Sequence, residues 1–236
     1  MTAPAPTSDD ILPLLLARVV FPSFHPLHGQ HGEVLGFAVR CRSGIVLFDT
    51  GVGEGSDVVD GFYAPERRPL ADALADHGVA LTEVTAVVNS HLHFDHCGNN
   101  HLLPGVPIYA QTEELQAART PRYTIPEWID FPGAEYRSVE GEHQVARDVR
   151  IVPTPGHTGG HQSLVVHVAG VDRPIVLAGQ AIASAAECEL LAAGGSVGEG
   201  DPPPDPDAYL ASAHRLLSLR PRRVHFSHDR AVWSAP

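Results

Sequence analysis

Six consecutive residues near the middle of the chain carry four side chains that bind metals. The stretch SHLHFDHCGNN starts at residue 90 and places His91, His93, Asp95 and His96 in the pattern HxHxDH. Imidazoles and carboxylates suit zinc and similar divalent cations, and three or more of them in one loop are costly to hold together without a cation. His91 and His93 occupy alternate positions and can point one way while Asp95 and His96 point another. The spacing therefore indicates ligands for two adjacent metals.

Two later segments add histidines directly after strand-like runs. His157 lies in the glycine-rich turn of TPGHTGGHQS, and His228 follows the apolar run RVHFS. A histidine of this kind on its own is more often a hydrogen-bonded structural residue than a ligand. Together with HxHxDH, however, both become candidate ligands.

Other histidines and cysteines give weaker signals. His25, His28 and His31 are regularly spaced in FHPLHGQH, but no acidic or thiol partner is near and proline and glycine mark a turn. We interpret them as part of a loop near the mouth of the cleft. Cys97 is interpreted as a small buried packing residue.

The elements that must position these side chains are short apolar runs bounded by glycine and proline. Strands are expected in two groups, with helices between them, and this order favours an α/β sandwich with two mixed sheets inside and helices outside. The expected strands cover residues 11–21, 33–41, 44–51, 84–90, 106–111, 148–154, 163–168, 174–179 and 223–227.

Two helices have recognisable ends. One is expected around 69–78, where Gly78 stands at the position of a C-terminal cap. The other is expected within 205–221, with Asp205 as the N-cap and Pro206 at the first helical position. Irregular segments at 119–136 and 192–206 have the composition of loops, and long loops in a compact domain often act as lids or binding segments.

Composition excludes several classes of function. The 236 residues are 43% hydrophobic and carry a formal net charge of −12, so the chain can bury a large core but lacks the positive charge that attracts nucleic acids or anionic membranes. All 16 basic residues are arginine, which excludes a lysine Schiff base and a lysine-bearing phosphate loop.

Cysteine usage and the first residues indicate a cytoplasmic protein. Three widely separated cysteines without a CxxC pair argue against a disulfide framework. The start has no basic region typical of a signal peptide, and the apolar run at 11–21 is too short to span a bilayer.

The chain resembles the metallo-β-lactamase-fold hydrolases, and among them the quorum-quenching N-acyl homoserine lactone lactonases. GIVLFDTGVG, SHLHFDHCGNN, TPGHTGGHQS, VLAGQA and HFSHD occur in the family order between about residues 33 and 230. The resemblance implies one domain over 1–236 with the αββα sandwich of that fold. It implies a first metal held by His91, His93 and His157, a second held by Asp95, His96 and His228, and an orienting role for Asp49; we interpret His161 as a hydrogen-bonding residue behind the ligands.

Two positions depart from the lactonase pattern. Gln180 stands where the lactonases carry an aspartate that bridges both metals, and Ala183 stands where they carry a tyrosine that polarises the lactone carbonyl. A neutral amide supplies no negative charge, so metal affinity should fall, most of all at the second site. Tyr123, Trp128 and Phe131 of the aromatic segment are expected to line the substrate pocket.

The leading hypothesis is a zinc-dependent hydrolase acting on a small ester or lactone, with a metal-activated hydroxide as nucleophile and Asp95 orienting it. Two zinc ions per chain are expected, with one as an alternative. A rival, motivated by Gln180, is a mononuclear and iron-dependent redox or biosynthetic enzyme. A second rival is a metal-binding family member without catalysis. The expected partner is a small molecule, and a homodimer is compatible with the sequence.

Overall fold

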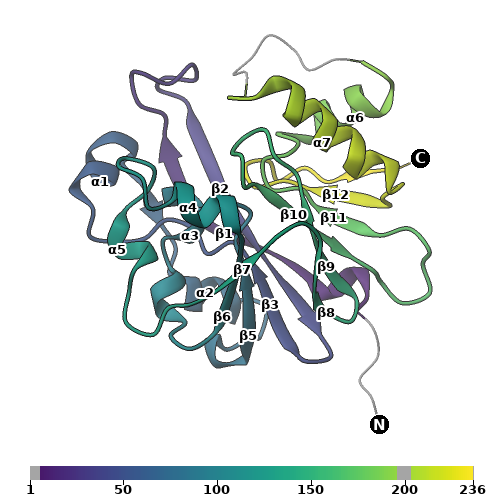
Figure 1. The fold of residues 1–236 in the computed structure, drawn as a ribbon, viewed down its shortest axis with the longest axis horizontal. Helices are drawn as coiled ribbons and strands as arrows, with labels where there is room; N and C mark the ends of the chain where they lie inside the picture. The colour runs from purple at the N-terminus through teal and green to yellow at the C-terminus, as the bar shows by residue number, and fades with distance from the viewer. Residues whose placement is uncertain (1–5, 196–202, 236) are drawn as a thin grey trace.

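The computed structural model describes residues 6–195 and 203–235 and contains two mixed β-sheets (Figure 1). The first sheet has the strand order β4-β1-β2-β3-β5-β6-β7, with antiparallel pairing from β4 to β3 and parallel pairing from β3 to β7. Its strands are β1 (Ile11–Val20), β2 (His31–Cys41), β3 (Gly44–Phe48), β4 (Glu66–Arg67), β5 (Val84–Val88), β6 (Pro107–Gln111) and β7 (Glu135–Val139).

The second sheet has the order β13-β12-β11-β10-β9-β8, and only its β11–β12 pair is parallel. Its strands are β8 (His143–Ala146), β9 (Val149–Pro153), β10 (Gln162–Val166), β11 (Ile175–Leu177), β12 (Arg223–His225) and β13 (Trp233–Ser234).

Helices cover the outer face of each sheet (Figure 1). In the described residues, no helix is both long enough and apolar enough to span a bilayer. The helices are α1 (Asp57–Tyr63), α2 (Leu70–Ala75), α3 (Phe94–Cys97), α4 (Thr112–Ala117), α5 (Pro126–Ile129), α6 (Ala185–Ala192) and α7 (Pro206–Ser218), with short 3₁₀ turns at Ser8–Asp10, Leu81–Glu83 and Asn100–Leu102.

Alternating residues of the strands fill two different layers of core. Phe37 and Phe48 of the first sheet pack against Ile151 of the second sheet, between the sheets. Their neighbours Ala38 and Leu47 face the other way and pack under α2. This alternation is the two-residue period of a strand buried on both faces. The predicted αββα sandwich is confirmed.

The predicted helices are present. Asp205 caps α7, because its side chain accepts a hydrogen bond from the backbone N–H of Ala208 at 3.0 Å. The helix predicted around 69–78 ends earlier, at Ala75, and Gly78 follows with a φ of +66°. The segment 119–136, predicted to be irregular, contains the short helix α5. Part of the predicted loop at 192–206 lies outside the described residues.

The segments that carry the candidate metal ligands follow the carboxyl ends of strands in both sheets. β3 and β5 run parallel, and the HxHxDH segment follows β5. In the second sheet β9, β11 and β12 share one direction, because β9 and β11 are both antiparallel to β10 and β11 is parallel to β12. Their carboxyl ends lead to His157, Gln180 and His228, so candidate ligands that are distant in sequence reach one edge of the sandwich.

Two glycines allow the HxHxDH segment to lie directly on the loop after β3. A Cβ on Gly98 would lie 2.6 Å from the Cα of Gly53 and 2.8 Å from the carbonyl carbon of Val52. The backbone N–H of Gly98 donates to the carbonyl of Gly51 at 2.8 Å. Only a residue without a side chain fits this approach of backbone to backbone.

Replacing Gly98 by alanine should therefore lower the free energy of unfolding by about 1–3 kcal/mol through overpacking. Urea unfolding of the metal-free protein measures this change. Gly61→Ala is the matched control, because nothing lies within 4 Å of a Cβ at this position in α1 and alanine should stabilise the helix by about 0.5–1 kcal/mol. Equal unfolding midpoints for Gly98→Ala and the wild type would contradict the packing argument.

Candidate metal centre

Three histidine side chains converge at the edge of the sandwich. The Nδ1 atom of His93 lies 3.0 Å from Nε2 of His91 and 3.2 Å from Nε2 of His157. Hence nitrogen atoms of three imidazoles meet within a few ångströms, and this group is one of two in the described residues that could hold a metal ion. We call His91, His93 and His157 the histidine triad.

Burial keeps the histidine triad uncharged. It places the pKa of His91 well below the usual value, that of His93 at about 4 and that of His157 at about 2. At neutral pH each ring therefore has a free lone pair on one nitrogen, the form in which histidine binds metals.

The second group consists of Asp95, His96 and His228, which we call the mixed triad. The carboxylate oxygen Oδ2 of Asp95 lies 3.4 Å from Nε2 of His96 and 3.5 Å from Nε2 of His228. The side chains of Asp95 and His228 are 15% and 26% exposed, whereas His96 is fully buried. The mixed triad therefore opens to solvent on the side of Asp95 and His228.

Charges in the mixed triad are strongly coupled. Burial raises the pKa of Asp95, but His96 and His228 outweigh burial and hold it well below its usual range. Burial lowers the pKa of His96, but the carboxylates of Asp95 and Asp49 outweigh it and raise the pKa to about 10. In the metal-free protein His96 therefore carries a proton and a positive charge at neutral pH. A bound cation would replace that proton.

Asp49 fixes the orientation of His96. Its Oδ2 atom lies 2.9 Å from Nδ1 of His96 and accepts a hydrogen bond from the hydroxyl of Ser90 at 2.8 Å, while Oδ1 accepts the backbone N–H of Ser90 at 2.7 Å. Asp49 has a φ of +65°, a left-handed conformation that aspartate adopts more readily than most residues. With Nδ1 engaged, Nε2 of His96 is directed toward the mixed triad.

The donor set fits a divalent metal. Among the described residues, Nε2 of His96 is one of two buried side-chain polar atoms without a hydrogen-bond partner. Buried polar atoms are normally paired, and an unpaired one that faces a carboxylate and another histidine points to a missing ligand such as a cation. Three neutral imidazoles beside an Asp/His/His group are also ligands that zinc prefers.

His161 lies behind the histidine triad, with its ring centroid 5.5 Å from that of His91, and it contacts the backbone of Gln180. The backbone N–H of Gln180 donates to Nε2 of His161 at 3.0 Å, and Nδ1 of His161 lies 3.0 Å from the carbonyl oxygen of Thr154. Burial lowers the pKa of His161 to about 3, so this histidine is neutral and can accept from Gln180. Its hydrogen bonds tie the loop after β11 to the end of β9.

The three aromatic residues expected in the substrate pocket have different surroundings. The ring of Tyr123 lies 4.9 Å from that of His93 and therefore beside the histidine triad. Trp128 is only 5% exposed and packs in a core cluster with Val52 and Val59, and Phe131 packs against the cluster that contains Ile108. Both side chains have apolar contacts with the core, and the expectation that Trp128 and Phe131 line the substrate pocket stays a prediction.

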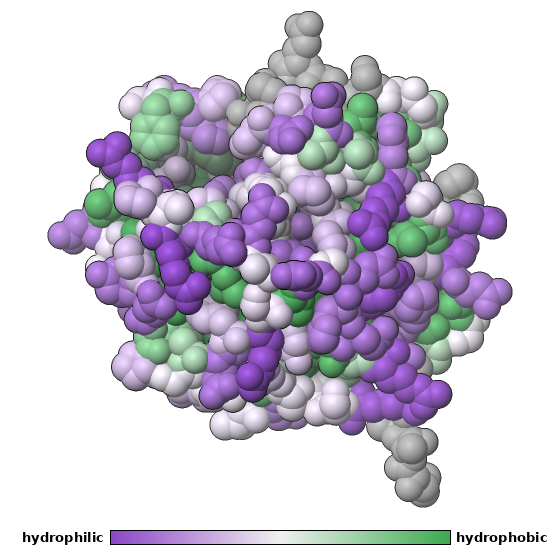
Figure 2. Space-filling model, viewed as in Figure 1, coloured by the Kyte–Doolittle hydropathy of each residue, from purple (hydrophilic) through white to green (hydrophobic). Residues whose placement is uncertain are grey.

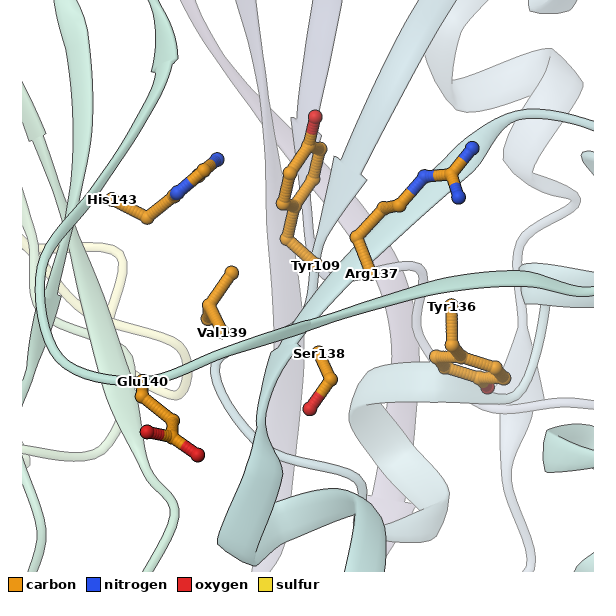
Figure 3. A pocket seen from close by; sticks show the side chains of 7 residues that line it. All are labelled: Tyr109, Tyr136, Arg137, Ser138, Val139, Glu140 and His143. Atoms are coloured by element: carbon orange, nitrogen blue, oxygen red, sulfur yellow. The ribbon is translucent and has the colours of Figure 1, made fainter.

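A separate surface pocket of about 590 Å³ lies where the two sheets meet at β7 and β8. Figure 3 shows Tyr109, Arg137 and His143 around it, with Glu140 in the connection between the strands. The rings of Tyr109 and His143 already contact each other, with their centroids 5.3 Å apart. None of the lining residues belongs to either triad, so this pocket is not part of the metal centre.

Several polar residues of the centre had no signal in the sequence strong enough to single them out. Asn89 donates from its side chain to the carbonyl of His96 at 2.9 Å, and Asn100 donates to the Asn89 side chain at 2.8 Å. Glu114 accepts hydrogen bonds from the backbone N–H of Leu92 and the hydroxyl of Thr158. Ser90 and Asn100 stand inside the motif stretch, but Glu114 is 22 residues beyond Leu92 and no local pattern marks it.

The buried neutral histidines predict an acid-sensitive metal-free protein. His91, His93, His157 and His161 have lowered pKa values when folded, so below about pH 6.5 the unfolded chain binds protons that the folded chain does not. Stability should fall from pH 7 to pH 5, by on the order of 1 kcal/mol per pH unit for each histidine. His96, with its raised pKa of about 10, contributes stability below pH 6.5 that is lost only as the pH rises toward 10.

Urea unfolding of the chelator-treated protein at several pH values measures this dependence. The His161→Gln variant lacks one of these buried histidines and should show a shallower slope. A free energy of unfolding that stays constant between pH 7 and pH 5 would contradict the inference.

The curated relatives that this chain matches are N-acyl homoserine lactonases. An N-acyl homoserine lactonase from Bacillus sp. is 33% identical over 152 residues, which cover 57% of this chain and 60% of the relative. The chain thus spans about 60% of the length of the curated relatives it matches.

Two solved structures share the fold. A mutant of Bacillus thuringiensis AiiA with bound N-decanoyl-L-homoserine has a TM-score of 0.77 at 23% identity, covering 96% of this chain and 94% of that chain. AidC, described as a dizinc quorum-quenching lactonase, has a TM-score of 0.60 at 17% identity, covering 89% and 81%. The model of the metallo-β-lactamase superfamily matches residues 36–228, most of the chain. With its two mixed sheets, flanking helices and paired triads at one edge, the chain belongs to the metallo-β-lactamase superfamily.

Proposed function

We propose that the protein is a metal-dependent hydrolase that opens a lactone or cleaves a related small ester. The observation that carries the proposal is the pair of triads: two sets of three metal-binding atoms lie side by side, with the rings of His91 and His96 only 4.1 Å apart. We propose two zinc ions, one in each triad. AidC, which shares the fold, is described as dizinc and supports this number.

A bound divalent metal supplies a Lewis acid and lowers the pKa of water toward neutrality. The rest of the chemistry falls to side chains of the protein. Asp95 is ionised, partly exposed and adjacent to both His96 and His228. Its free carboxylate oxygen can accept a proton from the attacking water and return it to the leaving alkoxide, as a general base and then a general acid. His91 and His96 are closed off from solvent and hold the geometry rigid.

A lactone with an acyl chain is the substrate class we propose. The matched relatives are N-acyl homoserine lactonases. Four exposed apolar side chains lie on the β1–β2 hairpin and on α1, and Figure 2 shows hydrophobic residues at the upper left, on this side of the molecule. Phe24 and Phe62 contact each other with ring centroids 5.4 Å apart, and Tyr63 of α1 contacts Phe94 of the metal motif at 4.4 Å. These apolar side chains, Phe24, Leu27, Val58 and Phe62, can cover an acyl chain that leaves the metal centre.

Gln180 favours a second candidate function. Without a carboxylate at this position, one triad can hold its metal less tightly than the other, and a mononuclear enzyme, with iron in place of zinc, would do redox or biosynthetic chemistry instead. The metal content of the purified protein distinguishes the two candidates.

Removing one member of the histidine triad should abolish metal binding at that triad and, with it, hydrolysis. For His93→Ala we expect kcat/KM for an N-acyl homoserine lactone to fall by more than the roughly 10- to 100-fold that follows loss of an outer hydrogen-bond partner. Inductively coupled plasma mass spectrometry gives the zinc content and pH-stat titration gives the rate. His214→Ala, on the exposed face of α7, is the control and should keep both. Turnover by metal-free His93→Ala protein would refute the mechanism, and iron with oxygen consumption would favour the mononuclear candidate.

Gln180→Asp should tighten metal binding and raise the rate of hydrolysis. A carboxylate offsets the repulsion between two cations, whereas an amide does not. Titration with zinc in competition with a chromophoric chelator measures the second binding constant, for which we expect a gain of about 10-fold or more. Gln180→Asn has the shape of the aspartate without its charge and should show no gain. Equal zinc affinity of the Asp and Asn variants would show that charge at this position does not limit binding.

A further inference from the structure

Glu114 is a fully buried carboxylate that has no cationic partner in the described part of the chain. It lies on α4 with an exposed fraction of 0%. Its Oε1 atom accepts the backbone N–H of Leu92 at 2.8 Å and the hydroxyl of Tyr123, and its Oε2 atom accepts the hydroxyl of Thr158 at 2.7 Å. Burying a charge without an ion pair costs free energy. Packing alone therefore does not account for a carboxylate at this position.

Two of its three partners are chain neighbours of the histidine triad, and the third contacts it. Leu92 stands between His91 and His93 in the chain, and Thr158 directly follows His157. Tyr123 lies with its ring 4.9 Å from that of His93. The three hydrogen bonds of one side chain therefore reach all three histidines, each through one intermediate residue.

The backbone also brings α4 against the loop of His157. A Cβ on Gly160 would lie 2.5 Å from the Cβ of Glu114 and 2.6 Å from its Cα, so only glycine permits this approach. None of the hydrogen bonds of Glu114 reaches α3 or the segment after β12, which carry the mixed triad.

We propose that Glu114 is the positioning residue of the histidine triad and supplies the negative charge that this triad lacks. A divalent cation among three neutral imidazoles gains no charge compensation from its ligands, whereas the mixed triad contains Asp95. A carboxylate placed behind the ligands lowers the free energy of the bound cation and fixes the ligand directions. The inference rests on the proposed metal centre and adds a residue to it.

The hydrogen-bond pattern allows charge and geometry to be separated. In Glu114→Gln the amide oxygen can keep the bonds from Leu92 and Tyr123, and the amide NH₂ can donate to the hydroxyl of Thr158, which rotates from donor to acceptor. This variant removes the charge and keeps the contacts. Thr158→Val keeps the charge and removes one contact.

The test measures zinc affinity by chelator competition in two backgrounds. His228→Ala leaves only the histidine triad complete, and His157→Ala leaves only the mixed triad complete. In the first background Glu114→Gln should weaken zinc binding by about 10- to 100-fold. In the second it should change the affinity by less than about 2-fold, the usual limit for sites that do not interact. Thr158→Val should give a smaller loss, again in the first background only.

Glu113→Gln is the matched control, because it removes the same charge from the neighbouring position of α4, which is not fully buried. It should leave zinc affinity unchanged in both backgrounds. Equal losses for Glu114→Gln in the two backgrounds, or no loss in either, would overturn the proposal, and circular dichroism of the metal-free variants shows whether an equal loss reflects unfolding. Since the assay needs no turnover, absence of lactone hydrolysis by the wild type would refute the proposed function without affecting this result.

Discussion

The ring nitrogens of His91, His93 and His157 face one another at 3.0–3.2 Å in a largely buried part of the protein. Uncharged imidazoles gain little from this arrangement, since three nitrogens cannot all be paired by hydrogens among themselves. The rest of the structure keeps them there. Strand ends bring the segments to one edge, close glycine contacts remove the space between loops, and buried hydrogen bonds restrict each ring.

The carboxylates around the centre are also placed by the packing of distant segments. Asp49 and Asp95 flank His96, while Glu114 lies behind the histidine triad. Asp49 and Asp95 compensate for the positive charge of His96. Glu114 accepts hydrogen bonds from Leu92, Tyr123 and Thr158. The mixed triad contains the carboxylate of Asp95 whereas the histidine triad contains none, so the distribution of charge between the two triads is unequal.

The aromatic segment shows how the same residue types can serve two purposes. Tyr123 lies beside His93, but Trp128 is drawn into the core and donates from its ring N–H to the carbonyl of Glu54 at 3.3 Å. Proline and aromatic content predict an irregular surface segment, and they do not say which rings point inward. Exposed apolar side chains also stand on the β1–β2 hairpin and on α1, where Phe24 is 65% and Phe62 is 52% exposed.

The sequence by itself determined the candidate ligands, the strands that carry them and the αββα order of layers, because strand periodicity and the HxHxDH spacing are local properties. It also identified Asp205 as a cap from two adjacent residues. The tertiary structure alone decided which side chains stand behind the ligands. Glu114 meets partners 9, 22 and 44 positions away, and contacts of such separation depend on how α4 packs against two loops, which no local pattern encodes.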